Sequence, residues 1–474
     1  MKKDKQFNLE KIILILILLS SIMFIVSYTT TKNIVFYDEG SYVGNGKNLF
    51  SGGELGRYES LRPPLMGLTV GALWAVGLDV VVAGKILISI CFVLLIYLLY
   101  IYSEALYKGS GLITALITLA SGVFLFWTNR LLTEIPSLLI LVFGLYLFHR
   151  KKYYLAGLVI SIGFLFRFSS ALILIGLFIY LFIKMFVERS YLPNIKIGLM
   201  LAGGFLTLAV PYFIISKIFF GSFLTSITSG QAAVGVFGQN AWHNFEFFIG
   251  TLWKQNILPV FLLAFIILLI ERTHIFTKAK NLKAIIPFSI AILSFLYFTL
   301  FTHTEARYMH QAIPFIALVA GWTLMYIVNL FKKNYKQYIR YAIVLVFFVL
   351  FIINGAHIIK EQRTYAVDPM RTQLLLLEEY FSMVPDGECA YVDEVQNVVY
   401  SDIKILGHGE YLKGIDRDKC KYFVIDAKNL SCSEDNSECK KRVTNLNTKL
   451  EEDQAEFVYN KVIFGRNRFV LKLN

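Results

Sequence analysis

Long apolar stretches recur along most of this chain and limit what it can fold into. About 20 apolar residues in a helix cross the roughly 30 Å hydrocarbon core of a bilayer. Of the 474 residues, 56% are hydrophobic, more than a soluble protein of this length can bury. The sequence therefore predicts an α-helical polytopic membrane protein with about eleven transmembrane helices. The predicted spans are 11–28, 80–102, 111–128, 134–149, 154–169, 170–187, 197–219, 255–271, 284–301, 310–330 and 341–358.

The charge distribution predicts an orientation in the membrane. The net charge of +13 is uneven: residues 1–359 hold 29 Lys and Arg against 13 Asp and Glu, whereas residues 360–474 hold 17 against 20. Nineteen of those 29 basic residues fall on one side if the N-terminus is cytoplasmic, as the positive-inside rule requires. We therefore expect a multi-pass protein of the cell membrane with a cytoplasmic N-terminus. The basic excess indicates topology and contact with the lipid bilayer, and no nucleic-acid partner is expected.

The chain divides into two predicted domains. Residues 1–358 form the transmembrane module, with long outer loops at 29–79 and 220–254 and an interfacial helix at 64–78. The Gly-rich part of the second loop, 230–238, is typical either of a mobile cover over a substrate or of a plain connector. Residues 359–474 form a small extracytoplasmic α+β domain, with a helix at 370–383 and strands at 389–392, 422–425 and within 456–473.

Four of the five cysteines lie in the C-terminal domain, and Cys91 lies in an apolar span. An odd number of spans places this domain outside, where disulfides form. The four cysteines permit three pairings, and free thiols remain an alternative. The four are Cys389, Cys420, Cys432 and Cys439.

An adjacent acidic pair, Asp38 and Glu39, follows the first span on the predicted outer side. Carboxylates are scarce in the membrane half of the chain. Such a pair either takes a proton from an acceptor hydroxyl, or binds a divalent metal ion that positions a phosphate, or belongs to a solvated loop. No cofactor is certain, and the candidate ligands of a metal ion are Asp38, Glu39 and Glu134.

Several ionisable side chains lie at or near the outer ends of predicted spans. Arg62 precedes a proline pair at the level of lipid headgroups, where it either binds a phosphate or anchors the interfacial helix. Arg130 and Glu134, four residues apart, form either an ion pair on one helix face or part of a site. Arg167 interrupts the apolar run 155–182, so it must face water, a carboxylate or a bound anion.

A second polar cluster enters the chain's tenth span from the same side. Residues 302–314 read Thr-His-Thr-Glu-Ala-Arg-Tyr-Met-His-Gln-Ala-Ile-Pro. His303, Glu305 and Arg307 are too close together for a simple membrane anchor. His303 alone is typical of a polar cap, whereas His303 with Arg307 beside it indicates phosphate binding.

Taken in order, these motifs resemble those of the GT-C glycosyltransferases, over residues 1 to about 358. Among the members of this family, the chain resembles the protein O-mannosyltransferases and the lipid A aminoarabinose transferases. No Trp-Trp-Asp triplet of the oligosaccharyltransferase type is present, so transfer of a whole glycan to asparagine is not expected. The shared features are Asp38-Glu39, Pro63-Pro64, Arg130 with Thr133-Glu134-Ile135-Pro136, and His303-Thr304-Glu305-Ala306-Arg307-Tyr308 with Pro314.

The resemblance implies an inverting hexosyl or pentosyl transfer from a polyprenyl-phosphate-linked sugar donor to a hydroxyl of a lipid, glycan or protein acceptor. It implies that Asp38 is the general base, supported by Glu39. Arg62 and Arg307 are then the phosphate-binding residues, together with Arg167. Supporting roles are implied for Glu134, Arg130, His303, Glu305 and Tyr308.

Two other functions are alternatives on the sequence. A transporter or flippase of polyprenyl-linked glycans typically has polar residues midway along its spans and repeated halves. Here Arg167 is the main charge within a span, and no repeat is visible. A non-catalytic membrane assembly protein has no need of the acidic pair. The lack of a repeat and the presence of the acidic pair both favour the transferase.

Overall fold

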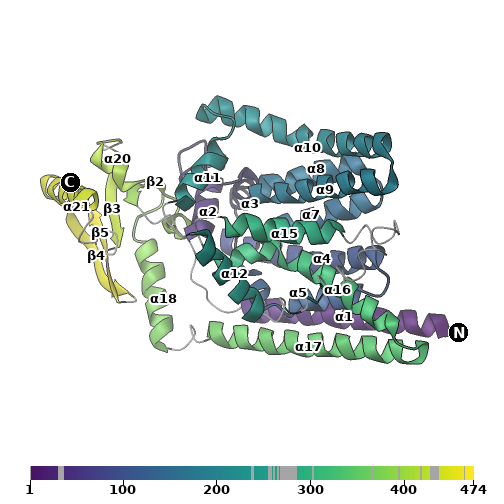
Figure 1. Ribbon diagram of the computed structural model, residues 1–474. Coiled ribbons are helices and arrows are strands. Elements are labelled where there is room, and N and C mark those ends of the chain that lie inside the picture. The colour runs from purple at the N-terminus through teal and green to yellow at the C-terminus, as the bar shows by residue number, and fades with distance from the viewer. Residues whose placement is uncertain are drawn as a thin grey trace. The chain divides into compact units, whose positions relative to one another are not determined.

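The computed structural model describes residues 2–29, 37–235, 240–254, 285–300, 304–363, 368–392, 396–416, 419–426, 437–463 and 465–473, with four single positions between 259 and 266. These residues divide into two compact units (Figure 1). Unit 1 comprises Met1–Thr30, Ser60–Pro63 and Ile86–Lys360. Unit 2 comprises Thr31–Glu59, Pro64–Lys85 and Glu361–Asn474.

Unit 1 is a bundle of apolar helices. Six helices in the described ranges are long and apolar enough to cross a membrane, and four further apolar helices are shorter, of which Pro64–Ala75 belongs to unit 2. The membrane-protein class is thus confirmed, while the number eleven stays a prediction, because most of the span expected at 255–271 lies outside the described residues. The helices are α1 (Lys2–Thr29), α4 (Val80–Leu106), α5 (Gly111–Leu119), α6 (Gly122–Trp127), α7 (Glu134–His149), α8 (Tyr153–Phe166), α9 (Ala171–Glu188), α10 (Tyr191–Phe220), α11 (Thr225–Gly235), α12 (Ala241–Lys254), α15 (Ile285–Thr299), α16 (Ile313–Leu330) and α17 (Lys333–Arg363), with 3-10 turns η1 (Phe168–Ser170) and η3 (Ala306–Gln311).

Local chemistry explains two differences from the predicted spans. The span expected at 111–128 is two helices, because Ser121 interrupts the ladder and its side chain accepts a hydrogen bond from the Phe124 amide. The Gly-rich segment expected as a loop is helical as far as Gly235, within α11. Residues 236–239 lie outside the described part.

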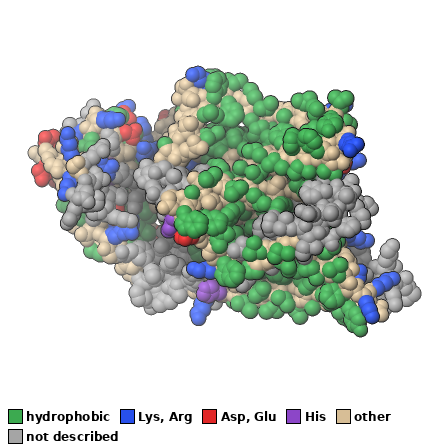
Figure 2. All heavy atoms as spheres, in the orientation of Figure 1, with side chains coloured by type: hydrophobic (Ala, Val, Ile, Leu, Met, Phe, Trp, Pro, Cys, Tyr) green, Lys and Arg blue, Asp and Glu red, His purple; other side chains and the backbone are tan. Residues whose placement is uncertain are grey.

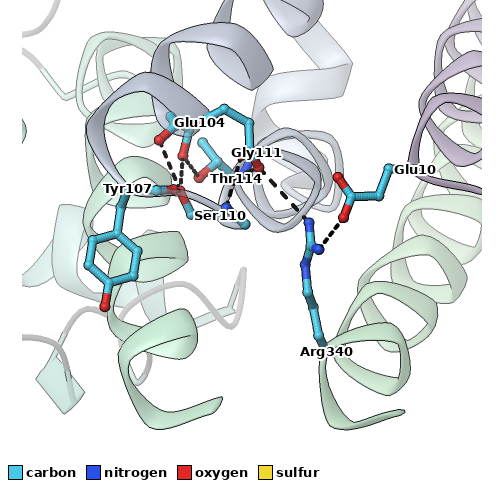
Figure 3. Close-up of polar contacts among 9 residues, drawn as sticks. Glu10, Glu104, Tyr107, Ser110, Gly111, Thr114 and Arg340 are labelled. Carbon is cyan, nitrogen blue, oxygen red and sulfur yellow. Dashed lines mark hydrogen bonds and ion pairs between the residues drawn. The ribbon is translucent and has the colours of Figure 1, made fainter. Parts of the chain in front are cut away.

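A partly buried polar cluster ties three helices together near the start of α1 (Figure 3). Arg340 of α17 pairs with Glu10 of α1, and its Nη2 lies 3.9 Å from Oε1 of Glu104 in α4. The Glu104 carboxylate accepts hydrogen bonds from the backbone amides of Gly109 and Gly111, both at 2.9 Å, and so caps the first turn of α5. One arginine thus fixes the relative positions of α1, α4 and α17.

Much of the described surface of unit 1 is apolar. Figure 2 shows hydrophobic side chains over most of its visible face, whereas charged side chains gather over the C-terminal residues. Exposed aliphatic and aromatic side chains on α1, α10 and α17 suit contact with lipid tails. Examples are Ile15, Leu16, Leu199, Ile218, Phe219, Leu345 and Val346.

Unit 2 combines two helices from the segment between α1 and α4, which is the predicted first outer loop, with the C-terminal α+β domain. The predicted interfacial helix is present as α3 (Pro64–Ala75), and a second helix, α2 (Tyr37–Phe50), starts at the acidic pair. A five-stranded sheet has the order β2-β1-β3-β5-β4, with β1 parallel to β2 and β3, and β5 antiparallel to β3 and β4. The remaining elements are α18 (Asp368–Phe381), β1 (Cys389–Val392), α19 (Asn397–Tyr400), β2 (Lys404–Leu406), α20 (His408–Leu412), β3 (Cys420–Asp426), α21 (Ser437–Glu452), β4 (Glu456–Ile463) and β5 (Arg466–Lys472).

A disulfide joins Cys389 of β1 to Cys420 of the neighbouring strand β3, with Cα atoms 4.4 Å apart. Parallel pairing of β1 with β3 brings these two cysteines together. Cys432 and the side chain of Cys439 lie outside the described part. The bridge lies in a core with Tyr391, Tyr411 and Phe423.

Candidate functional site

The acidic pair lies in the first turn of α2, where carboxylates interact favourably with the helix dipole. Asp38 is half-buried, whereas Glu39 is only 2% exposed. Burial raises the pKa of the Tyr400 hydroxyl, and the charges of Glu378 and Glu39 raise that pKa further, so Glu39 lies near α19 of the C-terminal domain. The solvated-loop alternative is therefore wrong for Glu39, and Asp38 is the more accessible carboxylate.

The central ion pair of unit 1 joins Arg167 to Glu134. Arg167 Nη1 lies 2.7 Å from Glu134 Oε1, and the glutamate is 4% exposed. Arg167 stands between α8 and η1 with an extended backbone, which explains the interrupted apolar run. Of the three surroundings predicted for this arginine, the structure shows a carboxylate.

The predicted helical pair of Arg130 with Glu134 is not formed, because α7 begins at Glu134 and Arg130 precedes the helix. Arg130 is buried, and its guanidinium carbon lies 5.7 Å from the centre of the Phe126 ring. Spacing four residues apart indicates a shared face only inside a helix.

Arg307 and Arg167 both contact one aromatic ring, that of Tyr308. Their guanidinium carbons lie 5.7 and 5.8 Å from the ring centre. Arg307 also lies 6.0 Å from the centre of the Trp127 ring and pairs with Glu305. The structure thus brings together Glu134, Arg167 and the 305–308 segment, which are far apart in the sequence.

Two side chains not selected from the sequence complete this cluster. The Ser169 hydroxyl donates to Gln311 Oε1 at 2.6 Å, and Gln311 Nε2 donates to the Ser169 carbonyl at 2.9 Å. Arg167 Nε donates to the same hydroxyl at 3.2 Å. Both residues border motifs that the sequence highlights, but neutral polar residues at helix ends carry no distinctive signal. Gln311 lines a small pocket together with Glu134, Ser137, Leu138, Leu141 and Arg167, and Ser169 supports that wall through its bond to Gln311.

The remaining predicted residues are placed as follows. Arg62 is partly buried in the segment between α2 and α3. His303 lies outside the described residues. Within the described ranges, no three His, Cys, Asp or Glu side chains come together as a metal site would require. Asp38 and Glu39 lie in unit 2 and Glu134 lies in unit 1, so these three residues stay a prediction as metal ligands.

Comparison with known proteins relates this arrangement to solved membrane enzymes. No protein-family model and no curated protein sequence matches the chain. Among solved structures, ArnT from Cupriavidus metallidurans bound to undecaprenyl phosphate is 12% identical with a TM-score of 0.62, and the match covers 97% of each chain. The Archaeoglobus fulgidus oligosaccharyltransferase tethered to an acceptor peptide is 12% identical with a TM-score of 0.56, over 96% of this chain and 74% of that one.

At identities this low, the structural similarity shows a common fold and no more. Both solved proteins are membrane glycosyltransferases of the GT-C type. The match to ArnT extends over the transmembrane helices and the small C-terminal sheet domain alike. The chain therefore has the GT-C fold of membrane glycosyltransferases.

Proposed function

We propose that the protein is a membrane glycosyltransferase that moves a sugar from a polyprenyl-phosphate donor to an acceptor hydroxyl on the outer membrane face, with inversion. The observation that carries this proposal is the pair of arginines, Arg167 and Arg307, held against Tyr308 in a fold shared with an undecaprenyl-phosphate-bound protein. Guanidinium groups bind phosphate oxygens in fixed geometry. A lipid-linked phosphate is the donor group that such a cluster fits.

The chemistry needs one base and a stabilised leaving group. Asp38 takes the proton of the acceptor hydroxyl, and the acceptor oxygen attacks the anomeric carbon on the face opposite the phosphate. The bond between that carbon and the phosphate oxygen breaks, and polyprenyl phosphate leaves with one more negative charge than the phosphate carried in the donor. Arg307, Arg167 and Arg62 offset that added charge, so the leaving group requires no proton.

The two carboxylates of α2 have different proposed roles. Asp38 is partly accessible and carries the base function, and buried Glu39 supports the helix start beside the C-terminal domain. Glu134 holds the Arg167 guanidinium in place through their ion pair. In this mechanism Glu134 acts through Arg167 and is a positioning residue.

Deletion of the gene tests the activity even while the identity of the sugar is open. A transferase leaves its polyprenyl-phosphate sugar accumulated on the outer leaflet, beside an unmodified acceptor. The alternative function, transport of a lipid-linked glycan, predicts accumulation on the inner leaflet instead. Mass spectrometry of extracted lipids, with leaflet assignment by an impermeant periodate reagent, distinguishes these outcomes.

A further inference from the structure

We infer that the ion pair between the buried Lys47 of α2 and the partly exposed Asp402 of the C-terminal domain positions the acidic pair for transfer. This inference rests on the function proposed above. It gives the C-terminal domain a catalytic purpose, which is to fix the helix that carries Asp38. Lys47 and Asp402 are then positioning residues.

Lys47 is saturated by groups of the C-terminal domain. Its Nζ lies 2.6 Å from Asp402 Oδ1 and donates to the carbonyls of Val398 at 2.5 Å and Ser401 at 3.2 Å. An ammonium group has three N–H donors, so these three acceptors satisfy it completely. Because Lys47 is only 4% exposed, loss of any acceptor leaves charge poorly compensated. The ammonium group therefore holds α2 in one place.

Asp402 also binds the other helix of the first outer loop. Trp74 Nε1, at the end of α3, donates to Asp402 Oδ1 at 3.1 Å. The Asp402 amide in turn donates to Asp386 Oδ1 at 2.6 Å. A single carboxylate thus joins α2 and α3 to the sheet domain.

The two helices cannot slide past each other at this joint. They cross where Gly46 meets Gly71, and a Cβ atom on Gly46 would lie 2.6 Å from the Gly71 nitrogen. The segment after α2 is tied down as well, because the Gly56 amide donates to the Ile403 carbonyl at 2.8 Å and its carbonyl accepts from the Ile405 amide at 3.1 Å. The α2–α3 hairpin is therefore held at Gly46 and Lys47 within α2 and again at Gly56 after it.

This attachment bears on Asp38 through the rigidity of the helix. Nine residues separate Lys47 from Asp38, about 13 Å along an α-helix. Fixing one face of α2 at Lys47 fixes the direction in which its first turn projects. A displacement of about 1 Å at a reacting group lowers rates about 100-fold. The contact accordingly acts on the chemical step and leaves donor binding intact.

The test compares Asp402→Asn and Lys47→Met with Lys461→Met in full-length protein reconstituted in nanodiscs. Lys461 is the matched control, since it pairs with Glu379 at 3.0 Å in the same unit and on the protein surface. Lys47→Met changes a buried side chain and can disturb folding. The Asp402 side chain is 43% exposed, so Asp402→Asn is the variant that we expect to fold in either case. The measurements are the rate of sugar transfer at saturating donor, the donor KM, and amide hydrogen exchange in residues 37–50.

We expect Asp402→Asn to lower kcat 10- to 100-fold, to change the donor KM less than twofold, and to speed exchange in residues 37–50. Lys461→Met should leave all three quantities near those of the wild type. A normal kcat and unchanged exchange in Asp402→Asn overturn the positioning role, and so does a loss confined to KM. Asp38→Asn run in parallel separates the two proposals: if it retains transfer, the proposed base is wrong whatever Asp402→Asn does, and the exchange data still decide whether the contact fixes α2.

Discussion

The Arg167 guanidinium donates to the Glu134 carboxylate across 2.7 Å, joining the residue that follows α8 to the residue that begins α7. A buried carboxylate and a largely buried guanidinium group compensate each other's loss of hydration. This pair also places Arg167 against Tyr308, beside Arg307. The candidate phosphate-binding cluster thus depends on a structural ion pair.

Removing one member of this pair should destabilise the protein strongly. Glu134→Leu leaves the Arg167 charge uncompensated, and we expect a loss of about 3 kcal/mol in the free energy of unfolding. Glu134→Gln retains an acceptor and should lose less. The control is Glu188→Gln, in the more exposed pair with Lys184 at 3.7 Å, for which we expect under about 1 kcal/mol. Thermal unfolding in detergent checks the order, and equal losses in Glu134→Leu and the control would contradict it.

Arg307→Ala should weaken donor binding with little effect on folding. Loss of one charge-assisted contact to phosphate corresponds to about 1.5–3 kcal/mol, or roughly 10- to 100-fold in Kd. Quenching of Trp127 fluorescence by undecaprenyl phosphate measures this, since Trp127 lies beside Arg307.

Arg150→Ala is the matched control for Arg307. The Arg150 guanidinium carbon lies 5.9 Å from the centre of the Tyr146 ring, a similar stacking contact. Arg150 follows the C-terminal end of α7, whereas the candidate site lies at its N-terminal end, where Glu134 begins the helix. We expect its affinity for undecaprenyl phosphate to be unchanged. An equal loss of affinity in both variants would show that Arg307 acts through folding.

Much of the fold could be predicted from the sequence, for reasons visible in single residues. The apolar runs indicated the helices, and the charged residue Arg167 marked the position where helix α8 ends. The helix of Asp38 lies in the segment 29–79, which was expected as an outer loop between two spans. Its glycines at 40, 44 and 46 weaken helix propensity, but packing of Gly46 against α3 requires a small residue. The partner of Arg167 could not be identified from the sequence, because a charged residue within a span indicates only that it has a partner and not which residue that is.

Within the C-terminal domain, short elements escaped prediction. Strand β2 has three residues, and its pairing with β1 depends on tertiary contacts that no local pattern encodes. Lys47 looks like an ordinary solvated lysine in the sequence. Its burial follows from groups about 350 residues away, at Val398, Ser401 and Asp402.

The close crossing of α2 and α3 makes a sharp prediction about Gly46. Gly46→Ala places a methyl group 2.6 Å from a backbone nitrogen, so the helices must separate, at a cost of about 1–3 kcal/mol. Gly203→Ala in α10 is the control, because in the described part of the chain no atom beyond its own stretch of helix lies within 4 Å of its Cβ position. That variant should be neutral or slightly stabilising. Thermal midpoints of the two variants check this, and a stable Gly46→Ala protein would show that the crossing is looser than described.

The Cys389–Cys420 disulfide should contribute to the stability of the C-terminal domain. It closes a loop of 31 residues, for which about 2–4 kcal/mol is typical. Cys389→Ser should therefore lower the unfolding midpoint, and reducing agent should lower the wild-type midpoint by a similar amount. Cys91→Ser, which removes a free thiol, should leave that redox sensitivity unchanged. A wild-type midpoint indifferent to reductant would contradict a structural role for the bridge.

The most direct test of the proposed function is the transfer rate of Asp38→Asn beside that of Glu39→Gln, measured with saturating lipid-linked sugar and acceptor. An amide has nearly the same shape as the carboxylate but cannot take the acceptor proton. We predict that Asp38→Asn loses about 10²- to 10⁴-fold in rate while donor Kd stays within twofold, and that Glu39→Gln loses less. Transfer by Asp38→Asn within tenfold of the wild type would contradict the assignment of Asp38 as the base.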